Sequence, residues 1–368
     1  MILYISINTM FMAKYSMRIT SAWPAAAILY ILFQFFVFRT VLPVLKSNNR
    51  SPWKNFIKAA AIAGVVIMLA AQLLVDPYTL NVDRWSALHY PIKYLLDGEY
   101  PYSAPTHLGG RASPFPVWQL FHIPFYLCNN VGLSFFAALA LFLWSVGKVI
   151  SKSSAWIALA LVSSSLAVYY EVTVRSDILA NFLLLASVIL WAIPYLSLQW
   201  IDRHYISISI AIGLFASTRI LTMLPIIILL LPYWLKMKPY KMVWAPIVVV
   251  CVFVATFLPI VLLDSHEFFH GQYPPWLLQT RQGHSFDFVI FAPLIVWFSL
   301  SWHKSLRKYC LLASIYMIIF VAISIVHSMI DSENYDLFGI MYDITYFTAA
   351  LPFILIGNLP RCSQLKSA

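Results

Sequence analysis

Polar residues that could do chemistry gather in one stretch, residues 83–118, of a chain that is otherwise mostly apolar. Charged residues make up only 10% of the 368-residue sequence, yet this stretch contains Asp83, Arg84, His89, Lys93, Asp97, Glu99, His107 and Arg111. A carboxylate such as that of Asp83 can take a proton from a hydroxyl as a general base, or hold a divalent cation through its oxygen atoms. It can equally do no more than cap a helix that follows it.

A second group of charges consists of Glu171, Arg175 and Asp177, which lie between two apolar segments. Charges in such a position are costly unless they are paired or hydrated. Glu171 and Arg175 are four residues apart and can pair on a helix. In the functional interpretation, the two carboxylates share a site with Asp83 and Arg175 binds a phosphate, which its guanidinium matches with two hydrogen bonds.

Further arginines lie apart in the sequence from carboxylates that could pair with them. Arg219 separates two apolar runs, and it either reaches lipid headgroups or binds an anionic ligand. Arg281, in the sequence QTRQGH, presents the same choice, and His284 belongs to the same candidate binding set. His266 and His270 reproduce the HExxH spelling, but their Gly- and Pro-rich surroundings favour solvated histidines over a metal site.

The composition determines which elements must position these side chains. Hydrophobic residues make up 61% of the sequence and its mean hydropathy is +0.80, values typical of a multi-pass membrane protein. The apolar runs are long enough for spanning helices and too long for barrel strands. We therefore expect an all-α transmembrane bundle of about ten spans, with one short or re-entrant helix.

The basic residues predict an orientation for the bundle. Lys46, Arg50, Lys54 and Lys58 form a short basic loop that should face the cytoplasm, and most of the 24 Lys and Arg residues then fall in inner segments. Lys14 and Arg18 fall on the outer side and count against this arrangement. The net charge of +10 thus reflects topology, and no nucleic-acid partner is expected.

This topology predicts one integral-membrane domain over residues 22–368, preceded by a loosely ordered extension over residues 1–21. Four loops should lie outside the membrane on the extracytoplasmic side, at 76–114, 170–177, 264–287 and 329–343. Four dispersed cysteines indicate neither a disulfide framework nor a zinc site.

The first outer loop has internal structure of its own. Trp85, Leu88, Ile92 and Leu95 recur at helical spacing, which predicts an amphipathic helix on the membrane surface that starts near Asp83 and ends at Gly98. After it, a turn-forming stretch leads to Ser113 and Pro114, which should begin the next helix.

These motifs resemble the GT-C superfamily of integral-membrane glycosyltransferases, especially the type that uses polyprenyl-phosphate-mannose. The similarity covers roughly residues 57–235, and it consists of an outer loop opening with Asp83, the Gly-Glu-Tyr-Pro-Tyr turn at 98–102, Ser-Pro-Phe-Pro at 113–116 and Arg-Ser-Asp at 175–177. The chain departs from the pattern by an additional span before the loop and by Asp-Arg in place of paired acids. The second departure leaves open whether a divalent cation is used as a cofactor.

The resemblance implies a reaction and a set of roles. One sugar would pass, with inversion, from a polyprenyl-phosphate-sugar donor to a hydroxyl of a glycan or glycolipid acceptor, on the extracytoplasmic face of what we expect to be a bacterial inner membrane. The implied catalytic residues are Asp83, as base, with Glu171 and Asp177. The implied substrate-binding residues are Arg84, Tyr102, Arg175, Arg219, Arg281 and His284.

Two other functions fit the same composition. A transporter or flippase for a lipid or a lipid-linked sugar would use outer arginines and acids as a path, and it predicts titratable groups near the middle of the membrane. A polysaccharide polymerase also has large outer loops rich in arginine, and it would transfer whole oligosaccharide blocks.

Overall fold

The computed structural model describes residues 1–47, 51–280, 287–302, 305–339 and 341–360. Over these residues the secondary structure is helical, apart from an isolated antiparallel bridge between Pro105 and Arg111. Among the described residues, six helical segments are long and apolar enough to cross a membrane: Trp23–Lys46 (α2 to α3), Pro52–Leu74 (α4), Val131–Val149 (ending in α7), Ile178–Tyr195 (beginning with α10), Pro239–Leu263 (α14 to α15) and Leu306–Ser332 (α19). An all-helical, multi-pass membrane protein is therefore confirmed.

The expected total of about ten spans is not confirmed and remains a prediction. A bent pair, α8 (Lys152–Ser163) and α9 (Leu166–Thr173), would add a seventh span. Four further apolar helices are shorter than a bilayer requires: Tyr205–Ala216 (α12), Ile220–Trp234 (ending in α13), Val289–Ser301 (within α18) and Ile344–Asn358 (ending in α20).

The chain divides into two compact units. The first contains Met1–Val75, Ala137–Trp191 and Lys304–Lys366, and the second contains Asp76–Phe136 and Ala192–His303 together with the last two residues. Each unit is assembled from segments far apart in the sequence. The prediction of a single integral-membrane domain from residue 22 onward is not tested by this division.

The first unit contains an N-terminal helix that the sequence analysis did not expect. Residues Ile2–Ser16 form α1, and the side chains of Tyr4, Ile7 and Phe11 on it are almost fully buried. The Asn8 side-chain oxygen accepts hydrogen bonds from the Ser165 hydroxyl at 2.6 Å and the Ala167 amide at 3.1 Å. The expectation of a loosely ordered extension is therefore wrong for α1, because its apolar side chains are core residues.

The break between α8 and α9 also differs from expectation. The two helices meet at Ser164 and Ser165 with a bend of 71°, and the Ser165 hydroxyl caps α9 by accepting from the Val168 amide at 3.3 Å. Because α9 continues to Thr173, the first half of the segment predicted as an outer loop at 170–177 is helical. The connection to α10 (Ile178–Ala192) is correspondingly short.

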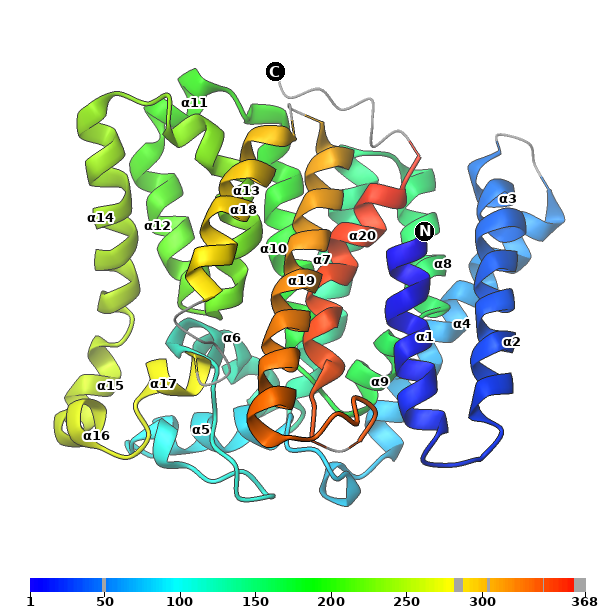
Figure 1. Ribbon diagram of the computed structural model, residues 1–368, viewed down its shortest axis with the longest axis horizontal. Helices are drawn as coiled ribbons and strands as arrows, with labels where there is room; N and C mark the ends of the chain where they lie inside the picture. Colours follow the sequence, from blue (N-terminus) through cyan, green and yellow to red (C-terminus); the bar gives the residue numbers. More distant parts are fainter. Residues whose placement is uncertain (48–50, 281–286, 303–304, 340, 361–368) are drawn as a thin grey trace. The chain divides into compact units, whose positions relative to one another are not determined.

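The second unit carries the first outer loop. Its helices include α5 (Ser86–Leu96), α6 (Pro116–Leu127), α11 (Leu198–Arg203), α16 (Ser265–His270), α17 (Pro275–Thr280) and α18 (Asp287–Ser301). Within this unit, α5, α15, α16 and α17 lie at one end and α11 lies at the opposite end (Figure 1). The polar loops that follow α4 and α15 (Leu258–Leu263) are thus gathered at one end of the unit.

Helix α5 has the amphipathic pattern expected of it. Leu88, Pro91 and Ile92 are buried, whereas Lys93 and Asp97 are exposed. The helix ends just before Gly98, whose φ of +79° is a left-handed conformation that glycine adopts without a steric penalty. The predicted start and end of this helix are both correct to within a few residues.

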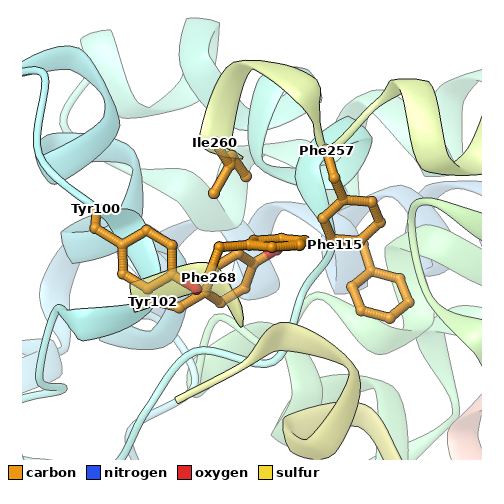
Figure 2. Close-up of a cluster of buried hydrophobic side chains, with 6 residues drawn as sticks. All are labelled: Tyr100, Tyr102, Phe115, Phe257, Ile260 and Phe268. Carbon is orange, nitrogen blue, oxygen red and sulfur yellow. The ribbon is translucent and has the colours of Figure 1, made fainter. Parts of the chain in front are cut away.

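An aromatic cluster fastens the loop to the rest of the second unit. It consists of Tyr100, Tyr102, Phe115, Phe257, Ile260 and Phe268 (Figure 2). Tyr100 and Tyr102 come from the loop, Phe115 directly precedes α6, and the others come from residues 257–268, which include α15 and part of α16. Burial of a large aromatic side chain contributes roughly 1.5–3 kcal/mol, so this cluster holds the loop in a defined position.

Candidate functional site

The Asp83 carboxylate is held by a hydroxyl rather than by a helix end. The Thr106 Oγ1 hydroxyl donates a hydrogen bond of 2.8 Å to Oδ2 of Asp83. Helix α5 begins after Trp85 and has no side-chain cap, although the Asp83 carbonyl accepts from the Ala87 amide at 2.9 Å. The alternative that the Asp83 side chain serves as the helix cap is therefore wrong, and the carboxylate is half-buried.

A tight hairpin over residues 106–110 brings Thr106 to Asp83. The Thr106 amide donates to the Gly110 carbonyl at 2.9 Å, and Gly109 turns the chain with a φ of +82°. A Cβ atom at Gly110 would overlap Oδ2 of Asp83 and would lie 3.1 Å from Oγ1 of Thr106. Glycine at position 110 thus allows the hairpin backbone to lie directly against the carboxylate.

His107 fixes this hairpin, which we call the 106–110 hairpin, to α5. Its Nδ1 atom lies 2.7 Å from the Ser86 hydroxyl and its Nε2 atom lies 3.2 Å from the Leu80 carbonyl. The imidazole also packs on the Trp85 indole, with ring centroids 5.6 Å apart. Both ring nitrogens of His107 are thus used to hold the hairpin that carries Thr106.

The segment 113–116 begins α6 beside the break between α12 and α13. The Phe115 amide donates to the Thr218 carbonyl at 3.2 Å, and the Val117 amide donates to the Ser217 carbonyl at 3.1 Å. These bonds satisfy amides at a helix start that have no partner within the helix. Arg219 follows directly and is 4% exposed, so its position at an interrupted helix is buried rather than at a lipid-facing surface.

Two tyrosines of the 98–102 turn have different environments. Tyr102 is 0% exposed and donates to the Pro114 carbonyl at 3.1 Å, so it packs inside the second unit. Its predicted role in substrate binding stays a prediction. Tyr100 lies with its hydroxyl 3.5 Å from the Tyr273 carbonyl. Burial, with smaller effects from the Glu267 and Asp264 carboxylates, raises the pKa of Tyr100, so its phenol stays protonated at neutral pH.

Glu171, Arg175 and Asp177 lie together at the α9–α10 junction of the first unit, as the sequence predicted. Glu171 and Asp177 are 1% and 3% exposed. The Arg175 guanidinium donates to the Gln72 and Val75 carbonyls at 2.6 and 3.2 Å, at the C-terminal end of α4, where a cation is favoured by the helix dipole. Arg175 therefore has a structural use that the phosphate-binding interpretation did not include.

Arg111 is a candidate residue to which the sequence analysis gave no role. It ends the 106–110 hairpin, directly after the glycine that touches Asp83, and its guanidinium carbon lies 4.3 Å from the centroid of the Tyr273 ring. The local sequence Gly-Gly-Arg indicates a binding role for Arg111 only weakly, because an arginine in a glycine-rich turn is usually solvated. Its partner Tyr273 lies in another loop, which no sequence spacing connects to it.

The structure thus joins Asp83 to Thr106 within the second unit and places Gly110, the residue before Arg111, against the Asp83 carboxylate. Arg84 follows Asp83 in the chain and is half-buried. Arg281 and His284 lie outside the described residues. Among the described residues, no group of three or more His, Cys, Asp or Glu side chains is placed to hold a metal ion. The use of a divalent cation as cofactor therefore stays a prediction.

The histidines of the HEFFH sequence lie on α16, which has six residues. The His266 and His270 rings are 5.7 Å apart, and the Asp264 side chain caps the helix by accepting from the Glu267 amide at 2.8 Å. This arrangement explains the sequence as a capped helical turn. Comparison with families of known proteins, with curated proteins and with solved structures found no match for the chain.

Proposed function

We propose that this protein is a membrane glycosyltransferase that moves one sugar from a polyprenyl-phosphate-sugar to an acceptor hydroxyl. The observation that supports this proposal most directly is the Asp83 carboxylate, which accepts a hydrogen bond from Thr106 and is not used as a helix cap. A carboxylate held in this way, in a loop between membrane-spanning segments, is suited to act as a general base. The donor, with its long hydrocarbon chain, is suited to an apolar protein.

In the proposed reaction, an acceptor hydroxyl gives its proton to Asp83 as its oxygen forms a bond to the anomeric carbon of the sugar. The bond from that carbon to the phosphate oxygen breaks, and the electron pair leaves with the polyprenyl phosphate. Attack opposite the leaving group inverts the anomeric centre. Negative charge grows on the phosphate, where a guanidinium stabilises it.

The proposal assigns the remaining residues in two groups. Glu171 and Asp177 stay candidates for a catalytic role, and Arg84, Arg219, Arg281 and His284 stay candidates for donor or acceptor binding. Arg175 is less suited to phosphate, because its guanidinium already binds two carbonyls at the end of α4. The orientation that we propose puts Asp83 on the extracytoplasmic side of a bacterial inner membrane, where a mannosyl or similar residue would be added to a cell-envelope glycan or glycolipid.

The test is transfer of labelled sugar from a panel of polyprenyl-phosphate sugars by the purified protein, with and without a chelator. We expect the wild type to transfer, and Asp83→Asn to retain its fold and lose at least ~100-fold in rate, the scale of a lost general base. Asp97→Asn is the matched control, because Asp97 is exposed at the end of α5 in the same loop.

Full activity of Asp83→Asn would refute the assignment of the base. If no donor is turned over while proteoliposomes containing the protein move lipid across the bilayer, a flippase replaces the transferase. Transfer of whole oligosaccharide blocks would indicate a polymerase.

A further inference from the structure

The guanidinium of Arg111 is held in place by the backbone and by one aromatic ring. Arg111 forms the bridge with Pro105 that closes the 106–110 hairpin, so its main chain is fixed. The guanidinium carbon is 4.3 Å from the centroid of the Tyr273 ring, a close cation–π contact. Stacking of this kind covers a face of the guanidinium and does not use its N–H donors.

Two donors of this guanidinium form no hydrogen bond with the described residues. Nε and Nη1 of Arg111 are buried and have no hydrogen-bond partner among the residues that the structure describes. A buried donor without a partner is unfavourable, and the penalty is larger for a charged group. The Asp83 carboxylate, which lies against the neighbouring Gly110, accepts its hydrogen bond from Thr106.

These observations describe a cation that is oriented by Tyr273, partly desolvated and without a counter-ion among the described residues. Oxyanions with several acceptor oxygens satisfy such a group best, and phosphate is the usual one for arginine. Arg111 also lies close in the chain to the proposed base, because Gly110, the residue before it, lies against the Asp83 carboxylate.

We propose that Arg111, supported by Tyr273, binds the phosphate group of a lipid-linked ligand. The phosphate site itself rests on the geometry of Arg111, whereas its identification with the leaving phosphate of a sugar donor rests on the proposed function. In that identification, Arg111 binds the phosphate oxygens and Asp83 receives the proton of the acceptor.

Binding of defined phosphate probes tests the proposal without any sugar transfer. The full-length protein in nanodiscs is titrated with farnesyl phosphate, with farnesol as the neutral analogue. Inorganic phosphate and phosphatidylglycerol are used as competitors, because they represent a free anion and a bilayer headgroup. We expect farnesyl phosphate to bind and farnesol to bind much more weakly.

The variants isolate the contribution of the guanidinium. Arg111→Gln should weaken farnesyl phosphate binding by roughly 10- to 100-fold, the scale of one charged hydrogen bond. Tyr273→Leu should weaken it by roughly 2- to 5-fold through loss of the stacking contact. Lys93→Gln removes an exposed positive charge from the same loop and should leave the affinity unchanged. Melting temperatures of all the variants report whether each remains folded.

Equal affinity of wild type and folded Arg111→Gln for farnesyl phosphate would overturn the proposal, and so would equal binding of farnesol. If Arg111→Gln does not fold, Arg111→Lys, which keeps the charge and loses the planar fork, should still bind more weakly than the wild type.

The competitors identify the source of the phosphate. If phosphatidylglycerol binds as strongly as farnesyl phosphate, the phosphate site stands and its ligand is a bilayer headgroup. If farnesyl phosphate binding depends on Arg111 but the protein transfers no sugar, the phosphate site stands and the proposed transferase function is refuted. If sugar transfer depends on Asp83 but Arg111→Gln leaves the affinity for farnesyl phosphate unchanged, the proposed function stands and the Arg111 phosphate site is refuted.

Discussion

Replacing Gly110 by alanine tests whether the position of the Asp83 carboxylate matters. The added methyl group would overlap Oδ2 of Asp83, so the carboxylate or the hairpin must retreat by about 1 Å to restore van der Waals contact. The carboxylate cannot simply rotate away, because its bond to Thr106 at 2.8 Å would be lost and Oγ1 of Thr106 would itself lie 3.1 Å from the new methyl group.

Two magnitudes follow from this geometry. Overpacking of this size costs about 1–3 kcal/mol of folding free energy. Displacement of a catalytic group by about 1 Å costs roughly 100-fold in rate. We therefore expect Gly110→Ala to melt at a lower temperature and to transfer sugar roughly 100-fold more slowly, with the loss in kcat rather than in KM.

Gly109→Ala is the matched control in the same hairpin. Its φ of +82° makes alanine unfavourable by about 1–2 kcal/mol, yet a Cβ atom there meets no atom within 4 Å. Gly109→Ala should therefore lose stability and keep most of its activity. Wild-type kcat in Gly110→Ala would refute the reasoning, and equal losses of activity in the two variants would show that hairpin stability rather than the carboxylate position is responsible.

Four further predictions follow from particular contacts. Thr106→Val removes the donor to Asp83 at nearly constant volume, and we expect a loss of about 1.5–3 kcal/mol in unfolding free energy, measured by chemical denaturation. Gly213→Ala should destabilise the α12–α14 contact by about 1–3 kcal/mol, because its Cβ would lie 2.8 Å from the Val249 carbonyl oxygen, whereas Gly147→Ala, with a contact of 3.6 Å, should have the wild-type melting temperature. Arg175→Gln should lower the melting temperature, since the guanidinium binds carbonyls at the end of α4; an unchanged melting temperature with a raised KM would instead support the substrate-binding interpretation. Because the folded-state pKa of Tyr100 is raised above its ordinary value of about 10, its contribution to stability is present below pH 10 and is lost as the pH rises above it, and Tyr100→Phe should flatten that part of the stability profile.

The sequence by itself determined the class of fold and much of the local structure. Long apolar runs must form helices in a membrane because each segment has to satisfy its own backbone hydrogen bonds. The spacing of Leu88 and Ile92 predicted α5, and Gly98 predicted its end, because both depend on short-range periodicity and backbone freedom. The position of Asp83 near the start of a polar loop between two apolar runs could also be predicted from the local sequence.

Only the tertiary structure decided what these residues contact. Asp83 and Thr106 are 23 positions apart, and the contact between Arg111 and Tyr273 joins two different loops of the second unit. Tyr102 is a core residue because it packs with α15 and α16, and α1 is a core helix because its apolar face is covered. Periodicity in the sequence indicates which side of a helix is apolar. The segment that covers this side depends on contacts between residues distant in the chain, and a single sequence has no local pattern from which those contacts can be predicted.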